Sequence, residues 1–518
     1  MNRREVLGAL RTLAGERSSF LASELKARLG AGRRADLRPI LGPCLDLLGL
    51  QVEELGDDLL ISHLPPARPF IPPRESVEAD ESFLSHPSIH GGLQELTEAY
   101  IAKKTGKRWN DPVVIDRIRA AIRAQKGEYW DQAGGRFISY RAGYRVLAYL
   151  AYQAPVSLIQ FEHLIHDLAA DGLLRERMRV LDMGAGPGTV PLAITDAWRR
   201  LGPGEVRISA VEAETENLEA YRSIVPAFAS GTPEVRIDEP VQADLRSMDP
   251  DDLPRELDLL VFGNVLNELR DLATGEKADL VTDCSRSLAG DGTLVIVEPA
   301  DLVNSLALRE LAGEIVRRGL TLYAPCTSLW NTTCRPDRCW TFREGPAITP
   351  PRLMALLSAA GDGYRYRNTD IKFSYAFLRK DGRTREAYRI PRGAKALRLS
   401  RLRGHLRRRV NVVVAKMSGD LGERGDHVFK VCDGTPRKPV FVVVPPHHAA
   451  RAGPLLEGRY GEILFLENIL VRINPARDAF NLFVDRFTRV GAPPGGERRK
   501  KPSPKGSAAP EKGGRGRR

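Results

Sequence analysis

The chain has 518 residues, of which 42% are hydrophobic, and it carries a formal net charge of +12 with a pI near 9.5. This length and apolar content allow three or four domains with cores of their own, which excludes a wholly disordered protein. We recognise no secretory signal and no apolar run of membrane length, so we expect a cytoplasmic protein without a membrane partner.

The region 1–64 is predicted to be helical, with a hairpin over 50–62. Two interpretations stay open for it: a winged helix, or a plain helical cap. Acidic residues beside the predicted turn argue against entry of this region into DNA, and we expect no DNA partner. The stretches with helical apolar spacing are 3–15, 19–29 and 34–50.

Prolines then mark a linker, expected over 65–90. Residues 91–170 are predicted to form a helical cap over one sheet edge and the mouth of a cofactor site. An α/β domain is expected over 171–378, because strand-like and helix-like segments alternate there.

The stretch 179–190 predicts a buried strand that turns into a helix through a glycine-rich loop. Gly184, Gly186 and Gly188 stand at alternate positions, which differs from the Gly-x-Gly-x-x-Gly spacing of dinucleotide folds. This favours S-adenosylmethionine (SAM) over NAD. The carboxylate and amine of its methionine part are expected to meet backbone N–H groups of the loop and Asp182.

Polar residues at the ends of the following strands complete the predicted cofactor site. Glu212 is the candidate for the two ribose hydroxyls, Asp244 for the adenine amino group, and Asn264 follows the next strand. The series predicts a doubly wound, Rossmann-like sheet of the class I SAM-dependent methyltransferase type. The strands are expected at 206–212, 241–245, 257–264 and 292–299.

Three of the six cysteines fall in one short segment, 324–343. In a reducing cytosol such clustering indicates metal binding more than disulfides. Cys326, Cys334 and Cys339 leave one ligand position open, for which Cys432 is the candidate. From spacing alone, zinc and an iron-sulfur cluster fit equally. The remaining cysteines are expected in apolar cores: Cys44 and Cys284.

Basic residues are concentrated in two segments. Between 379 and 409 there are thirteen Lys or Arg against two acids, and between 491 and 518 nine against two. The first is predicted to be a connecting segment and the second a disordered tail. Because the two runs flank one folded region, we expect them to bind phosphates of a nucleic acid.

The flanked region, 410–490, is predicted to be an OB-like β-barrel, a fold that often binds single-stranded nucleic acid. It contains short β-rich runs separated by turns. These runs are 410–416, 427–431, 439–444, 462–466 and 479–484.

Several short motifs occur together in the second half of the chain: Glu298-Pro299, Tyr323-Ala-Pro-Cys326, Cys334, Cys339, Phe342 and Lys372-Phe-Ser-Tyr375. On these motifs, and over roughly 90–490, the chain resembles the ribosomal small-subunit methyltransferase-like proteins, whose mitochondrial members help to assemble the small ribosomal subunit. The resemblance implies a SAM-type domain, a partner in the small ribosomal subunit and its RNA, and an iron-sulfur cluster, expected as [4Fe-4S], on Cys326, Cys334, Cys339 and Cys432. This chain departs from the family in three respects. It has Thr327-Ser328 where Pro-His is usual, and Cys339-Trp-Thr-Phe342 where Cys-His-Phe is usual. The spacings between its cysteines also differ.

Two functions follow as hypotheses. The first is a methyltransferase that acts on small-subunit ribosomal RNA with SAM as donor. The second is a non-catalytic ribosome assembly factor that uses SAM and the metal structurally. The turn after the fourth strand, Gly263 to Glu268, lacks the Pro-Pro-aromatic sequence of many amine methyltransferases, and we assign no catalytic base or nucleophile.

Overall fold

A computed structural model of the chain describes residues 3–30, 38–65, 67–130, 144–202, 204–326, 328–330, 334, 339–359, 364–422 and 425–495. These residues form two compact units. Unit 1 contains the chain up to residue 327, then 334–387 and 417–419. Unit 2 contains 328–333, 388–416 and the chain from 420 onward.

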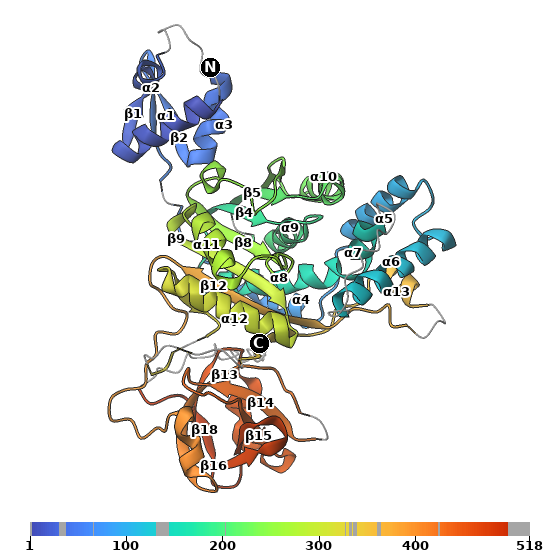
Figure 1. Cartoon of the computed structure of the whole chain (residues 1–518), viewed down its shortest axis with the longest axis vertical. Helices are drawn as coiled ribbons and strands as arrows, with labels where there is room; N and C mark the ends of the chain where they lie inside the picture. Colours follow the sequence, from blue (N-terminus) through green and yellow to red (C-terminus); the bar gives the residue numbers. More distant parts are fainter. Residues whose placement is uncertain are drawn as a thin grey trace, which may run out of the picture. The chain divides into compact units, whose positions relative to one another are not determined.

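Unit 1 begins with three helices and a small antiparallel sheet of order β1-β3-β2 (Figure 1). Its core is apolar, with Leu10, Leu25 and Ile61 fully buried. The hairpin expected over 50–62 is present as β2 and β3, which supplies the wing-like hairpin that a winged helix requires. The elements are α1 (Arg3–Glu16), β1 (Ser19–Leu21), α2 (Ala22–Arg28), α3 (Arg38–Leu48), β2 (Leu50–Leu55) and β3 (Asp58–His63).

A helical layer follows, and its first helix lies inside the expected linker. This helix, α4, docks because the buried Asp80 is bonded to Nδ1 of His166 at 2.8 Å and accepts from Nε of Arg200 at 2.8 Å. A linker prediction from prolines alone missed this buried carboxylate. The helices are α4 (Arg74–Ser85), α5 (Gly91–Thr105), α6 (Pro112–Trp130), α7 (Tyr144–Tyr152) and α8 (Ala154–Ala170).

The central sheet of unit 1 has the order β10-β12-β9-β8-β4-β5-β6, with β7 added to β5 and β11 added to β12. The strands from β9 to β6 are parallel, whereas β12 is antiparallel to β9 and β10 is antiparallel to β12. The strands are β4 (Arg177–Met183), β5 (Glu205–Glu212), β6 (Val235–Ile237), β7 (Val241–Gln242), β8 (Leu257–Gly263), β9 (Leu288–Pro299), β10 (Thr321–Ala324), β11 (Arg343–Gly345) and β12 (Ile371–Arg379).

Strand order reverses between β4 and β8, so right-handed crossovers place the connecting helices on opposite faces of the sheet. In Figure 1, α9 and α10 cover one face and α11 and α12 the other. A crevice for ligands is expected where the order reverses, at the carboxyl ends of the strands. The predicted methyltransferase-like α/β fold is confirmed by this topology. The helices are α9 (Thr189–Leu201), α10 (Thr215–Ala229), α11 (Thr274–Ser285), α12 (Leu302–Arg317) and α13 (Arg352–Ser358).

Two expectations about this sheet need correction. The strand expected over 241–245 is reduced to the two residues of β7, because β6 takes most of the position beside β5. The basic run 379–409 is also not one connecting segment. Arg379 is buried at the end of β12 and is bonded to Thr293 and Asp381, and Arg385 is paired with Asp171 and Asp167.

Unit 2 contains a closed five-stranded barrel in which β13, β14, β15, β17 and β16 follow one another and β16 returns to β13. All of these pairings are antiparallel except that of β15 with β17. Alternate apolar side chains fill the interior, so the OB-like prediction is confirmed. The strands are β13 (Arg409–Lys416), β14 (His427–Cys432), β15 (Val440–Val444), β16 (Ile463–Asn474), β17 (Ala479–Phe483) and β18 (Arg489–Gly491), the last pairing with β16.

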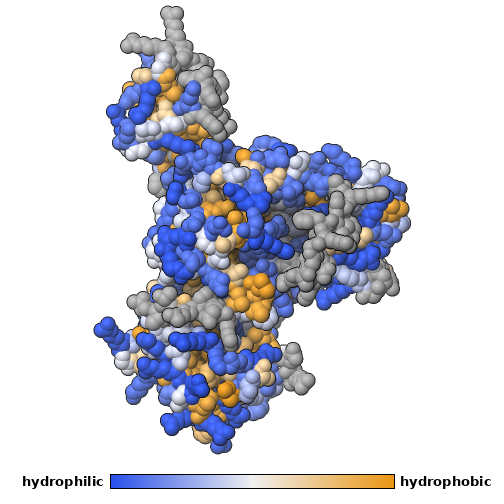
Figure 2. All heavy atoms as spheres, in the orientation of Figure 1, coloured by the Kyte–Doolittle hydropathy of each residue, from blue (hydrophilic) through white to orange (hydrophobic). Residues whose placement is uncertain are grey.

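Short helices complete the described part of the chain: η1 (Pro250–Asp252), η2 (Leu399–His405), η3 (Pro446–Ala452), α14 (Gly453–Glu457) and η4 (Pro475–Arg477). Within the described residues, no helix has the length and apolar character needed to cross a membrane. Figure 2 shows hydrophilic residues over much of the visible face, with apolar residues in smaller groups. The predicted disordered tail lies outside the described residues from 496 onward.

Candidate functional site

The loop after β4 turns at three glycines that all have left-handed backbone conformations, with φ of 76° at Gly184, 56° at Gly186 and 97° at Gly188. A Cβ at Gly184 would lie 2.4 Å from Cγ2 of Val265, and one at Gly188 would lie 2.2 Å from Cγ2 of Val225. A Cβ at Gly186 would meet no atom within 4 Å. The outer glycines therefore allow close packing, whereas the middle one faces open space.

Glu212 joins this loop to the end of the neighbouring strand β5. Its side chain is buried, and Oε2 accepts a hydrogen bond from the backbone N–H of Gly186 at 2.7 Å. Oε1 accepts from the N–H of Glu214 at 2.8 Å. Each oxygen keeps a second lone pair for a further donor. The predicted contact with ribose hydroxyls thus stays a prediction that the arrangement of the carboxylate allows.

Asp182, near the end of β4, is 1% exposed, and neither carboxylate oxygen has a hydrogen-bond partner among the described residues. Burial and the charge of Glu212 raise the pKa of Asp182 to about 8. An isolated buried carboxylate is costly unless a donor or a cation pairs with it. The site therefore fits a ligand that brings an ammonium group, as the methionine part of SAM does.

The other two predicted cofactor residues also lie at the carboxyl ends of the strands. Asp244 comes two residues after Gln242, which pairs with Glu212 in the β5–β7 register. Its carboxylate accepts hydrogen bonds from Arg246, which lower the pKa of Asp244. Asn264 has a φ of 57° and donates its backbone N–H to Val297 O at 2.8 Å. Asp244 is thus already engaged by a guanidinium, which the sequence did not predict.

Two further acidic residues belong to this edge of the sheet. Glu268 follows β8, and desolvation by the surrounding protein together with the charge of Glu212 outweighs Arg145 and raises the pKa of Glu268. Glu298 ends β9, and burial raises its pKa to about 8. Asp182, Glu212, Glu268 and Glu298 thus bring four carboxyl groups to this edge of the sheet, and a cationic ligand would favour their ionised forms.

Tyr149 of α7 also reaches the site, because its hydroxyl lies 3.4 Å from Oγ1 of Thr189 at the start of α9. Burial raises the pKa of Tyr149, and Asp182 and Glu268 add to this effect. Sequence analysis missed both Tyr149 and Glu268. A signal existed for Glu268, which follows a predicted strand end. The sequence held no such signal for Tyr149, because only the packing of the helices brings its hydroxyl to the crevice.

The four predicted metal ligands are divided between the two units. Cys326, Cys334 and Cys339 belong to unit 1 and Cys432 to unit 2. Cys326 Sγ lies 3.9 Å from a guanidinium nitrogen of Arg309, and Cys432 Sγ accepts from a backbone N–H at 3.3 Å. No group of three or more His, Cys, Asp or Glu arranged to hold a metal occurs among the described residues. The cluster therefore stays a prediction. Cys44 and Cys284 are buried, as expected.

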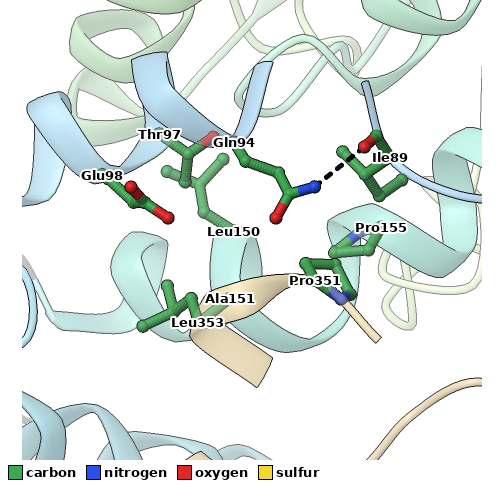
Figure 3. A pocket seen from close by; sticks show the side chains of 9 residues that line it. All are labelled: Ile89, Gln94, Thr97, Glu98, Leu150, Ala151, Pro155, Pro351 and Leu353. Atoms are coloured by element: carbon green, nitrogen blue, oxygen red, sulfur yellow. Dashed lines mark hydrogen bonds between the residues drawn. The ribbon is translucent and has the colours of Figure 1, made fainter. Parts of the chain in front are cut away.

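A small cavity occurs elsewhere in unit 1, among α5, α7, α8 and the segment leading into α13 (Figure 3). Its volume is about 30 Å³, which is room for about one water molecule. Gln94 lies across it and donates to Ile89 O at 2.8 Å. This cavity is too small for a cofactor or a nucleotide substrate.

Comparisons with known proteins bear on both units. Residues 400–493 match the family model described as the C-terminal domain of DUF8157, a domain of unknown function. No curated protein matches the chain.

Solved structures similar to this chain include SAM-dependent methyltransferases. A putative one from Methanococcus maripaludis is 20% identical, with 32% of this chain and 64% of that chain covered and a TM-score of 0.21. The mitomycin 7-O-methyltransferase MmcR is 15% identical, with 62% and 90% covered and a TM-score of 0.26. CalS10, an amino pentose methyltransferase from Micromonospora echinaspora, is 21% identical, with 32% and 58% covered and a TM-score of 0.20.

The chain therefore spans less than two thirds of the Methanococcus and Micromonospora proteins. Because the TM-scores are low, the fold rests on the order and direction of the strands in the central sheet. That order, with its glycine loop at the point of reversal, gives unit 1 a fold similar to that of class I SAM-dependent methyltransferases.

Proposed function

We propose that this protein binds SAM at the crevice of unit 1 and transfers its methyl group to RNA of the small ribosomal subunit. The proposed binding of SAM is supported by the buried Asp182, whose two carboxylate oxygens lack hydrogen-bond partners among the described residues. It lies on the strand that leads into the glycine loop, where Gly186 faces open space. A cationic ligand at this position would relieve the cost of the buried charge.

The residues of the crevice have distinct proposed roles. Asp182 would pair with the ammonium group of SAM, Glu212 would accept from the ribose hydroxyls, and Asp244 would accept from the adenine amino group. SAM, when bound, supplies an electrophilic methyl group on a sulfonium. Asn264 and Glu268, on the loop after β8, would border the acceptor. With no base assigned, positioning of the acceptor is the main contribution of the protein.

The RNA acceptor is supported by charge. The formal net charge is +12, and residues 491–518 alone carry nine Lys or Arg against two acids. Arg379 and Arg385 serve buried ion pairs inside unit 1, so they do not contribute to this surface. The OB-like barrel of unit 2 belongs to a fold that frequently binds nucleic acid. The resemblance to ribosomal small-subunit methyltransferase-like proteins supports the ribosomal target.

The same resemblance supports an iron-sulfur cluster, in the [4Fe-4S] form, on Cys326, Cys334, Cys339 and Cys432. Structural zinc on the same thiolates is the alternative, since four cysteines suit either. Cys326 beside the guanidinium of Arg309 supports this proposal, because a nearby cation favours the thiolate that a metal requires.

A non-catalytic assembly factor is the second candidate. The loop after β8 favours it, because Gly263 to Glu268 contains no proline and lacks the usual turn of amine methyltransferases. In this function SAM and the metal would stabilise the fold, and the basic segments would hold RNA.

One experiment separates the two candidates. Small-subunit RNA from cells with and without the protein is mapped for methylated nucleotides by mass spectrometry. Purified protein and SAM are then added to the RNA from cells that lack it. Restoration of a missing methyl group by the wild-type protein, but not by Asp182→Asn, supports the enzyme. An unchanged methylation map would contradict it and leave the assembly factor.

A further inference from the structure

The barrel of unit 2 carries two phenylalanine rings that are each covered by a guanidinium. Phe487, between β17 and β18, is 52% exposed. The guanidinium carbons of Arg409 and Arg486 lie 4.6 Å and 4.7 Å from the centre of its ring. The guanidinium of Arg472 lies 4.9 Å from the ring of Phe483. Exposed aromatic rings next to cations are costly for solubility and common at sites that bind ligands.

Strand register brings these two rings into one region of the barrel. Leu470 of β16 pairs with Arg409 on one side and with Phe483 on the other. Phe487 follows β17 by four residues and lies under Arg409, so both rings lie beside the row formed by Arg409, Leu470 and Phe483. Arg472 is two residues along β16 from Leu470, on the same side of the strand.

The cations of this region differ in how firmly they are held. Arg409 is bonded to both carboxylate oxygens of Asp485, at 3.0 Å and 2.5 Å, and donates to Asn468 O at 2.9 Å. It therefore neutralises Asp485 and fixes Phe487. Arg486 and Arg472 are exposed, and within the described part of the chain their guanidinium groups contact the phenylalanine rings and no carboxylate. These two cations can turn toward a ligand at little cost.

Two further arginines lie beside the strand that carries Arg472. Arg407 and Arg408 are exposed and run beside β16, because the N–H of Arg407 donates to Val471 O and Arg408 O accepts from the N–H of Val471. The region is thus strongly positive as well as aromatic. We call it the arginine–phenylalanine surface: Arg407, Arg408, Arg409, Arg472, Phe483, Arg486 and Phe487.

We infer that the arginine–phenylalanine surface binds single-stranded RNA, with a base stacked on Phe487 and phosphates on Arg486 and Arg472. This inference rests on the proposed function, in which RNA is the partner. Rings with a cation beside them suit unpaired bases, because every base offers a flat face and the backbone supplies the negative charge. In an RNA duplex the base faces are stacked on one another, so exposed rings would have nothing to contact. An acidic protein would use the cations but not the rings.

The test measures binding of the full chain to a fluorescent oligouridylate of about 12 nucleotides, over a range of salt concentrations. Phe487→Leu removes the stacking ring, whereas Phe487→Trp keeps one. Arg486→Ala removes a phosphate contact. Arg451→Ala, on η3, makes the same charge change at an exposed arginine outside this surface.

Phe487→Leu and Arg486→Ala should each weaken binding roughly tenfold, and Phe487→Trp should bind as the wild type does. Only Arg486→Ala should also lower the slope of log affinity against log salt. Arg451→Ala should change neither quantity.

Three outcomes would overturn the inference. If the wild type binds the oligonucleotide and both Phe487→Leu and Arg486→Ala bind equally well, this surface is not the RNA site and the proposed function survives. If the wild type binds no RNA at low salt, the RNA part of the proposed function fails together with the inference. If duplex RNA or polyglutamate competes as well as the single strand does, the surface is a general binder of anions.

Discussion

Glu212 at the end of β5 accepts a hydrogen bond from the backbone N–H of Gly186 at 2.7 Å, so the end of β5 holds the middle of the loop that follows β4. The same carboxylate accepts the N–H of Glu214 at 2.8 Å. Two crevice-forming loops therefore depend on one buried side chain. We therefore expect SAM binding to depend on how well Glu212 holds these two loops in place.

Glu212→Gln should weaken SAM binding roughly tenfold to a hundredfold, because a charged hydrogen bond contributes about 1.5–3 kcal/mol. Glutamine also has only one side-chain oxygen, so it cannot accept the N–H groups of Gly186 and Glu214 with separate oxygens as Glu212 does. Titration calorimetry measures the affinity. Glu214→Gln is the control, since the Glu214 side chain is exposed and only its backbone N–H contacts Glu212. If both variants bind SAM with the affinity of the wild type, Glu212 does not contact the cofactor.

Gly186→Val should abolish SAM binding while the protein stays folded, because the added side chain enters the open space beside the loop. Strain of about 1–2 kcal/mol is expected from the left-handed backbone. Gly202→Val is a matched control, with a φ of 62° and no atom within 4 Å of its Cβ. Thermal unfolding should show similar losses for the two variants, and calorimetry should show lost binding only for Gly186→Val. A Gly186→Val protein that binds SAM normally would place the cofactor elsewhere.

Gly188→Val should unfold unit 1 rather than block a ligand, since its Cβ would lie 2.2 Å from Cγ2 of Val225. Circular dichroism and thermal unfolding distinguish this loss of fold from the loss of binding in Gly186→Val. A Gly188→Val protein with wild-type stability would contradict the close packing of the loop on α10.

Asp182→Asn should have opposite effects on stability and on binding. Burial raises the pKa of Asp182 to about 8, above the value of about 3.9 for an unfolded chain. Folding without ligand therefore takes up a proton between these values, and this part of the stability is lost as pH rises from about 4 to about 8. The free energy of unfolding of Asp182→Asn, relative to wild type, should increase with pH over this window.

SAM binding provides the second measurement on Asp182. An ammonium group binds the ionised carboxylate, so binding at pH 7 should release a proton from the wild type. Calorimetry in buffers of different ionisation enthalpy detects that proton. Asp182→Asn should bind SAM more weakly and should release fewer protons on binding. Identical proton release in both proteins would show that Asp182 does not contact the cofactor.

Anaerobically purified protein should be brown and contain iron and sulfide if the four cysteines hold a cluster. Serine at Cys326, Cys334, Cys339 or Cys432 should remove both elements, whereas Cys284→Ala should keep them, because Cys284 is buried in the core of unit 1. Colourless protein with one zinc per chain would replace the cluster by a zinc site. Full metal content in Cys432→Ser would exclude a ligand from unit 2.

Deletion of 496–518 should weaken RNA binding and flatten its salt dependence by at least about one unit of slope, because nine Lys or Arg are removed. The deletion starts after Pro494, whose carbonyl accepts from the hydroxyl of Tyr388 at 3.0 Å, so the fold of unit 2 is kept. An unaltered slope would mean that the tail does not contact phosphates.

The sequence by itself indicated strands β4, β5, β8 and β9 of unit 1, the helical segments between them, and the five strands of the barrel. Short apolar runs that end at Asp182 and Glu212 and are followed by turn residues are typical of buried strands, and the alternate glycines after Asp182 indicate a tight turn into a helix. These are local properties of the chain, so they are readable without a structure.

Tertiary structure decided the rest, because contacts between distant residues leave no local pattern. It placed α4 where prolines indicated a linker, through bonds from His166 and Arg200 to Asp80. It brought Tyr149 and Glu268 to the crevice and withdrew Arg379 and Arg385 from the basic surface into ion pairs. The register of β13, β16 and β17 brought Arg409 and Phe483 to either side of Leu470. Burial and pairing of charges depend on the packed chain, and no spacing of residues along it specifies them.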